Sequence, residues 1–176
     1  IDKDLAVQWF YKACESDLRV AASPRALHIF NYIIPSHIDL VSPIIKGMVK
    51  SQQDEVAMQG ASQVTARWIF FGYFKKEFEK CLKGRSVLRR GVADVAAKLL
   101  KDERYSRMCQ EILYQLMNDP DKDVRNELHS ILNNNYLFEN QEYQAFIRAY
   151  IKSQAFVDNP DLFIVRSNEV AVNLIP

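Results

Sequence analysis

The chain has 176 residues, of which 48% are hydrophobic and 26% are charged, and its formal net charge is +1. This balance is typical of a soluble globular protein, and the length suffices for one domain with a sizeable core. The near-neutral charge excludes a global attraction to nucleic acid or membrane, and no run approaches the roughly 18 apolar residues of a membrane span.

The cysteines and the first residues predict where the chain belongs. Cys14, Cys81 and Cys109 are odd in number, far apart and without CxxC spacing. Such cysteines are expected to be small core residues in a reducing compartment, which favours the cytoplasm. The chain begins at Ile1 with no apolar signal-peptide core, and it lacks an initiating Met. We therefore expect a cytoplasmic fragment of a larger protein.

Apolar residues recur at helical spacing through the first half of the chain. The pattern predicts helices over about 5–20, 24–34, 37–50, 54–69 and 73–83. Ser23 is a good N-cap, with Pro24 at the first helical position. Pro35 is expected to break the chain between helices, and Pro43 to kink the next one. Gly84 is predicted to end the helix over 73–83 as a residue outside the last turn.

The second half shows the same periodicity. It predicts helices over about 86–100, 102–116, 119–132 and 142–156. Asp102 and Asp119 are predicted N-caps, with Pro120 at a first helical position, and the run Asn133–Asn135 is a stop. The stretch 160–176 is compatible with a short helix, a tail or a cap. Because no low-complexity linker divides the chain, we predict a single domain over 1–176.

The segment DPDKDVR at 119–125 predicts the tight turn of a helical hairpin. Val124 starts a helix there, and Val87, Val56 and Pro24 stand in comparable places. These four positions are separated by 32, 31 and 37 residues. Helix pairs that recur near such a period indicate a stacked solenoid.

This pattern resembles the HEAT-repeat family over about residues 23–134. The best unit runs from Ile112 through the 119–125 turn to Leu132, and the units 41–70 and 87–100 match in part. Ala57 stands where the family has Arg, and Arg89 comes one place late. The resemblance implies an all-α protein: an α-α superhelix, or right-handed solenoid, of about four to five HEAT-like hairpins. An irregular helical bundle is the alternative.

Two glycines support close packing of predicted helices. Gly60 and Gly91 lie within helical patterns, where each lowers the helix propensity by about 1 kcal/mol relative to Ala. This cost is offset if a neighbouring helix packs closely against the glycine. We therefore expect a close helix contact at both positions.

Positive charge is concentrated in residues 75–107, which contain eleven basic and five acidic side chains. The basic side chains Lys83, Arg85, Arg89 and Arg90 cluster beside a predicted helix start. A basic ridge of this kind binds phosphate backbones or acidic protein surfaces. The alternative is an ordinary solvated face with ion pairs one helical turn apart.

Aromatic residues are dense between 68 and 78, which helical spacing distributes over more than one face. Trp68 and Tyr73, together with Phe71 or Phe74, are candidates to extend into a partner-binding groove, because exposed aromatics are common binding anchors. The alternative is that they fill the core.

No motif predicts catalysis. The three histidines have no metal-ligand spacing. The acids at 119, 121 and 123 resemble the start of a calcium loop, but Val124 and Ser130 stand where that loop needs Gly and Glu. A DNA-glycosylase use of Trp68 with Asp54 or Asp94 has no supporting motif. We expect no enzymatic activity, no catalytic or metal-binding residue and no cofactor.

These observations predict a protein-interaction or scaffold module built from HEAT-like repeats. The alternative is a nucleic-acid-binding module that uses residues 75–107. Similar helical arrays form sensor or scaffold parts of large multidomain proteins, including signalling NTPases, and this analogy motivates the first prediction. A protein is the expected partner, and no membrane association is expected.

Overall fold

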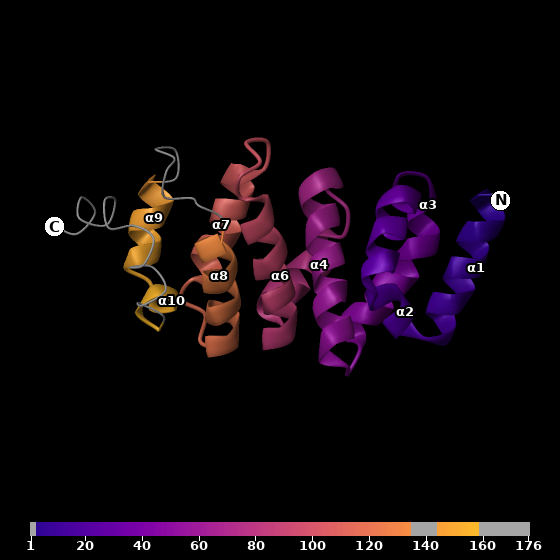
Figure 1. Ribbon diagram of the computed structural model, residues 1–176, viewed down its shortest axis with the longest axis horizontal. Coiled ribbons are helices and arrows are strands. Elements are labelled where there is room, and N and C mark those ends of the chain that lie inside the picture. Colours follow the sequence, from indigo (N-terminus) through magenta and orange to yellow (C-terminus); the bar gives the residue numbers. More distant parts are fainter. Residues whose placement is uncertain (1–2, 135–143, 159–176) are drawn as a thin grey trace. The chain divides into compact units, whose positions relative to one another are not determined.

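The computed structural model describes residues 3–134 and 144–158 (Figure 1). In this part of the chain the protein contains ten helices and no strand, which confirms the all-α prediction. The helices are α1 (Lys3–Ser16), α2 (Leu18–Ala22), α3 (Pro24–Lys50), α4 (Asp54–Phe71), α5 (Lys75–Lys83), α6 (Ser86–Leu99), α7 (Ser106–Leu116), α8 (Lys122–Asn134), α9 (Gln144–Ile151) and α10 (Gln154–Val157). Among the described residues no helix has the length and apolarity needed to cross a membrane.

The chain divides into two compact units, Ile1–Gly91 and Val92–Pro176, and the boundary falls inside α6. The single domain over 1–176 stays a prediction.

Unit 1 is organised around the long helix α3, which packs against α1, α2 and α4. The buried apolar side chains of α3, among those described, include Ala26, Phe30, Val41, Ile44, Ile45 and Met48. Phe30 also receives the edge of Phe10 from α1, with the ring centroids 5.3 Å apart. The hydrophobic core of unit 1 therefore lies along both sides of α3.

Two glycines allow close helix contacts in unit 1. A Cβ atom on Gly60 would lie 2.7 Å from the Cβ of Met48 in α3, and one on Gly91 would lie 2.3 Å from the carbonyl oxygen of Met58 in α4. The hydroxyl of Ser62 donates a hydrogen bond of 3.2 Å to the carbonyl of Gly91. The close helix packing expected at both glycines is confirmed.

Unit 2 packs α7 against α8 and α9, and α10 against α8 and α9. Its fully buried side chains include Leu113, Val124, Leu128 and Tyr150. Val124 has no exposed surface, so the inward register predicted for the start of α8 is confirmed.

The turn between α7 and α8 is braced by Arg125. Its Nη1 donates a 2.5 Å hydrogen bond to the carbonyl of Asp119, and its Nε donates at 2.6 Å to Oδ2 of Asp158, just beyond α10. The backbone N–H of Ala155 donates to the carbonyl of Met117 at 3.0 Å. The side chains of Arg125 and Asp158 are only 11% and 14% exposed. Arg125 therefore ties the hairpin turn to α10.

The N-terminus of α3 follows the prediction, but its continuation does not. Ser23 caps α3 by accepting a hydrogen bond of 3.3 Å from the N–H of Ala26, with Pro24 in the first turn. The break predicted at Pro35 is wrong, because α3 runs on to Lys50. A proline removes one helical hydrogen bond, but packing on three neighbouring helices stabilises α3 enough to outweigh that loss.

The single helix predicted over 5–20 is also wrong. Asp17 interrupts it, because its carboxylate accepts a hydrogen bond of 2.9 Å from the N–H of Arg19 and caps the short helix α2. The helix predicted over 142–156 is likewise divided in its described part. Ser153 separates α9 from α10, and its hydroxyl donates at 2.6 Å to the carbonyl of Tyr150.

Two predicted N-caps lie earlier than the helices that they were expected to begin. Asp102 accepts from the N–H of Arg104 at 3.1 Å within a turn, and α7 begins only after this turn. The carboxylate of Asp119 accepts a hydrogen bond of 2.9 Å from the N–H of Asp121. The carboxylate of Asp121 accepts one of 2.8 Å from the N–H of Asp123. Asp side chains close such turns as readily as they cap helices, so both predicted starts are wrong by a few residues. The predicted stretch 160–176 lies outside the described residues.

Candidate functional site

Helix α4 ends in a turn that we call the aromatic turn, residues Phe70–Phe74. Gly72 adopts the left-handed conformation, with φ 72° and ψ 8°, directly after the helix. Its N–H donates to the carbonyl of Trp68 at 2.9 Å, and the N–H of Tyr73 donates to the carbonyl of Arg67 at 3.2 Å. Glycine tolerates this conformation without a Cβ clash, so Gly72 ends α4 cleanly.

A second left-handed residue, Phe74, joins the aromatic turn to α5. Its φ of 62° and ψ of 28° are unusual for a bulky side chain and cost about 1–2 kcal/mol. The ammonium of Lys46 in α3 lies 6.0 Å from the centroid of the Phe74 ring and 3.4 Å from the carboxylate of Glu77. The left-handed conformation of Phe74 therefore places backbone strain at the aromatic turn.

Gly84 ends α5 as predicted, but its φ of −86° is not left-handed.

Three aromatic side chains of this turn are exposed and packed together. Phe70, Phe71 and Tyr73 are 36%, 51% and 43% exposed. The rings of Phe70 and Phe71 meet edge to face with centroids 6.0 Å apart, and those of Phe71 and Tyr73 lie 5.9 Å apart. These three side chains form the aromatic patch, a contiguous apolar surface. The structure thus exposes Tyr73 and Phe71, two of the aromatic candidates named from the sequence.

Trp68 has a different place from the one expected. It is half-buried, stacked on the buried ring of Phe78 with centroids 6.0 Å apart and an interplanar angle of 26°. The ammonium of Lys75 lies 5.8 Å from the centroid of the Trp68 ring. Trp68 therefore packs against α5, while Phe70 and Phe71 supply the exposed rings. In the sequence, the residue that could have indicated which of these aromatic side chains are exposed is Gly72, because it fixes the end of α4.

The basic residues singled out from the sequence are partly engaged within unit 1. Lys83 is exposed, while Arg89 and Arg90 are half-buried. Arg85 donates at 2.6 Å to the carbonyl of Ser51 and lies 3.8 Å from a carboxylate oxygen of Asp54. Arg85 thus braces the turn between α3 and α4.

Arg89 is engaged in the same way. Its guanidinium donates a hydrogen bond to the carbonyl of Gly84 at the end of α5. The remainder of the basic segment, residues 92–107, lies in unit 2, where local ion pairs join Lys98 to Asp94, Arg104 to Asp102 and Arg107 to Glu111. A continuous basic ridge over 75–107 stays a prediction.

The three cysteines are core residues, as predicted. Cys14, Cys81 and Cys109 are fully buried free thiols. Burial raises the pKa of Cys14 to about 11. Burial, together with the nearby charges of Glu77 and Asp102 respectively, raises the pKa values of Cys81 and Cys109 to about 12. Within the described ranges no group of three or more His, Cys, Asp or Glu side chains is placed to hold a metal ion.

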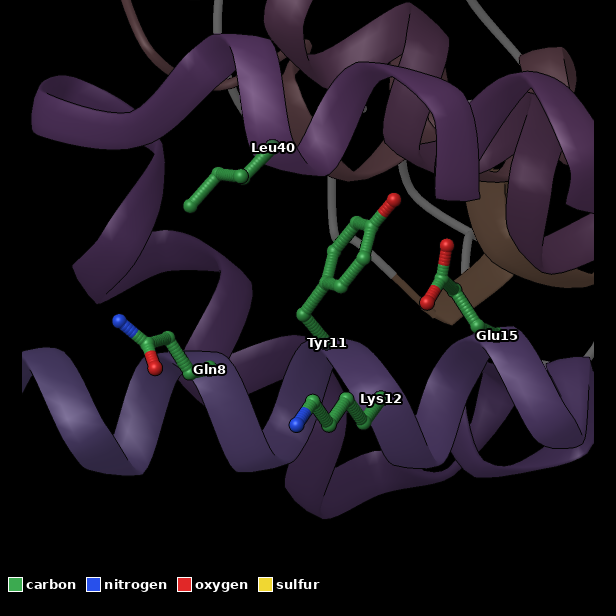
Figure 2. A pocket seen from close by; sticks show the side chains of 5 residues that line it. All are labelled: Gln8, Tyr11, Lys12, Glu15 and Leu40. Carbon is green, nitrogen blue, oxygen red and sulfur yellow. The ribbon is translucent and has the colours of Figure 1, made fainter.

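A shallow depression of about 240 Å³ lies between α1 and α3 (Figure 2). Gln8, Tyr11, Lys12 and Glu15 line it from α1, and Leu40 lines it from α3. A hydrogen bond from the Tyr11 hydroxyl to Glu15 raises the pKa of Tyr11. The lining offers one cation, one anion and one amide, so it does not favour one class of ligand.

Unit 2 contains a buried histidine paired with a buried tyrosine. Nδ1 of His129 is hydrogen-bonded to the hydroxyl of Tyr150, and each residue is 1% exposed. Burial lowers the pKa of His129 and raises that of Tyr150, so both side chains are neutral at neutral pH.

This pair predicts a pH dependence of stability. Below about pH 6.5 the unfolded chain binds a proton at His129 before the folded chain does, so the free energy of unfolding decreases as the pH falls toward the lowered folded pKa. The slope for one proton is at most about 1.4 kcal/mol per pH unit. Urea titrations at about pH 7 and about pH 5.5 measure it. His129→Gln is expected to flatten the slope, and an unchanged slope in that variant would assign the effect to other groups.

Comparisons of the chain with protein-family models, with curated proteins and with solved structures gave no match. Function is therefore inferred from the aromatic turn and the charges around it.

Proposed function

We propose that the chain is a protein-interaction module whose contact site is the aromatic patch of Phe70, Phe71 and Tyr73. The exposed, contiguous packing of these three rings is the observation that carries the proposal. In this proposal the module is a scaffold part of a larger cytoplasmic protein, built as an α-α superhelix of HEAT-like hairpins.

The aromatic patch suits binding because its groups are apolar, large and held in place. Rigid aromatic side chains cost little conformational entropy when a partner covers them, and they dominate the binding energy of many interfaces. The backbone beneath them is fixed by hydrogen bonds from Gly72 and Tyr73 and by the left-handed conformations at Gly72 and Phe74. The strain at Phe74 favours a functional role for this turn, because such strain tends to persist at functional sites.

Local features of each unit support the HEAT-like architecture. In unit 2 the buried Val124 and the contact from Arg125 to the carbonyl of Asp119 match the family's hairpin turn. In unit 1 the close contacts at Gly60 and Gly91 are those of tightly packed neighbouring helices. Stacked hairpins bury the apolar faces that one hairpin leaves exposed.

Nucleic-acid binding through residues 75–107 is the alternative. The excess of basic side chains in that segment favours it. The engagement of Arg85 and Arg89 with backbone carbonyls reduces the donors available to phosphate. We therefore place protein binding first.

A capture experiment tests the proposal with the whole chain as bait in host lysate, with and without nuclease treatment. The wild type is compared with a Phe71→Ser/Tyr73→Ser variant and with Trp9→Ser, which removes a 69% exposed aromatic ring elsewhere in unit 1. Loss of a binding anchor typically costs 2 kcal/mol or more, about thirty-fold in affinity. We expect a protein that the wild type and Trp9→Ser retain, and that the double variant loses by at least about tenfold in quantitative mass spectrometry.

Circular dichroism establishes that the variants are folded, since exposed substitutions usually change stability by less than about 0.5 kcal/mol. Equal capture by the wild type and the double variant would contradict the aromatic patch as the contact site. Capture that disappears with nuclease, and that Lys83→Glu/Arg85→Glu/Arg89→Glu/Arg90→Glu abolishes in a folded protein, would establish the nucleic-acid alternative.

A further inference from the structure

We infer that the aromatic patch binds an acidic amphipathic segment of a protein partner, in which large apolar side chains are flanked by Asp or Glu. This inference rests on the proposed function and adds the chemistry of the partner. In the bound state an apolar side chain covers Phe71 and Tyr73, and neighbouring carboxylates lie next to Lys75 and Lys76.

Positive charge lies directly after the aromatic turn. Lys75 and Lys76 follow it directly and are exposed at the start of α5. Arg67, in α4 just before the turn, is 3% exposed, and its guanidinium donates at 3.0 Å to the amide oxygen of Gln63. Burial lowers the pKa of Arg67 only to about 10, so it remains a cation at neutral pH.

Two acidic side chains, Glu77 and the exposed Glu79, follow the turn in α5, where they are outnumbered by Lys75, Lys76 and Lys80. Glu77 is 3.4 Å from Lys46, so its charge is matched locally. The acidic residues of α4, Asp54 and Glu55, lie in its first turn, about 25 Å along the helix from the aromatic turn. No side chain caps the first turn of α5, whose N–H groups therefore add partial positive charge next to Lys75. This surface is complementary to carboxylates.

The arrangement of the rings favours a peptide over single-stranded nucleic acid. Bases stack on open ring faces, with arginine and lysine side chains along the phosphates. Here Phe71 packs against both Phe70 and Tyr73, so the rings form one continuous apolar surface. Apolar peptide side chains fit such a surface, and lysines at its edge select acidic neighbours and increase the rate of association.

Selection from a random 12-residue peptide library displayed on phage tests the inference. The wild-type chain is the target, and the folded Phe71→Ser/Tyr73→Ser variant removes peptides that bind elsewhere. We expect the surviving peptides to combine large apolar residues with a net negative charge. Neutral or basic consensus sequences would overturn the inference, as would a selection in which no peptide distinguishes the two proteins.

Affinity measurements on the strongest peptide complete the test. In a Trp9→Phe background Trp68 is the single tryptophan, and its fluorescence reports binding beside Lys75. We expect Lys75→Glu/Lys76→Glu to raise the Kd by about tenfold or more, and added salt to raise the wild-type Kd. The matched control Lys12→Glu/Lys50→Glu, at two exposed lysines of unit 1, is expected to change the Kd by less than about twofold.

Equal effects of the two charge reversals would overturn the inference, as would tighter binding of a fluorescein-labelled oligothymidine than of the peptide to the wild type. The capture experiment separates this failure from that of the proposed function. A partner that the Phe71→Ser/Tyr73→Ser variant loses and the Lys75→Glu/Lys76→Glu variant retains would leave the proposed function intact and remove only the acidic partner. A partner that both variants retain would contradict both.

Discussion

Gly91→Ala is expected to destabilise the protein by about 3 kcal/mol, the upper end of typical overpacking costs, or to prevent folding. The new Cβ would lie 2.3 Å from the carbonyl oxygen of Met58 and 2.9 Å from the Cβ of Ala61. Both obstacles belong to α4 and cannot rotate away, so the helices must separate. The better helix propensity of Ala offsets only about 1 kcal/mol of that cost. Urea denaturation followed by circular dichroism measures the change in the free energy of unfolding.

Gly47→Ala is the matched control, because Gly47 also lies in a helix of unit 1. Its Cβ would lie 3.5 Å from a methyl carbon of Leu18, which is ordinary van der Waals contact. We expect this variant to be more stable than the wild type by about 0.5–1 kcal/mol. Equal stability of Gly91→Ala and Gly47→Ala would show that α4 and α6 do not pack as closely at Gly91 as described.

Val124→Asp is expected to have an effect of similar size in unit 2. Val124 is fully buried, so the carboxylate must either be ionised in an apolar environment or take up a proton with a raised pKa. Either outcome is expected to cost several kcal/mol, on the order of 3–5. Thermal unfolding measured by calorimetry is the appropriate test, and the loss should be smaller at acidic pH, where the buried carboxyl is neutral.

Val157→Asp provides the comparison for that substitution, because Val157 in α10 is 60% exposed. The same chemical change at this position is expected to alter the free energy of unfolding by less than about 0.5 kcal/mol. A melting temperature of Val124→Asp that equals that of the wild type would disprove the inward register of α8.

Sequence reasoning located the helices well where the signal is local. The Ser23 cap with Pro24, and the inward face at Val124, depend on neighbouring residues that the sequence shows directly. The break expected at Pro35 failed because packing around α3 outweighs the missing hydrogen bond, and that packing is not local. The interruption at Asp17 was missed because an Asp within an apolar period gives no strong signal of its own.

The candidate site was predicted only in part. Aromatic density pointed to the segment of the exposed rings and to Phe71 and Tyr73, but not to Phe70, which gains its exposure from the end of α4 at Gly72. The basic cluster was identified by composition, which cannot show that Arg85 reaches the carbonyl of Ser51, 34 positions earlier in the chain. Partners that are distant in sequence are set by packing, so residue type and spacing alone do not reveal which charges remain available to a ligand.

The buried cysteines allow thiol alkylation to report how often the protein opens. A thiol reacts only as an accessible thiolate, so Cys14, Cys81 and Cys109 can be alkylated only during moments when the surrounding helices part. Cys81 lies in unit 1 and Cys109 in unit 2, so their alkylation rates report the opening of each unit separately. Equal alkylation rates with the same urea dependence would mean that the two units open together in one cooperative step. Unequal rates would mean that one unit opens more readily than the other.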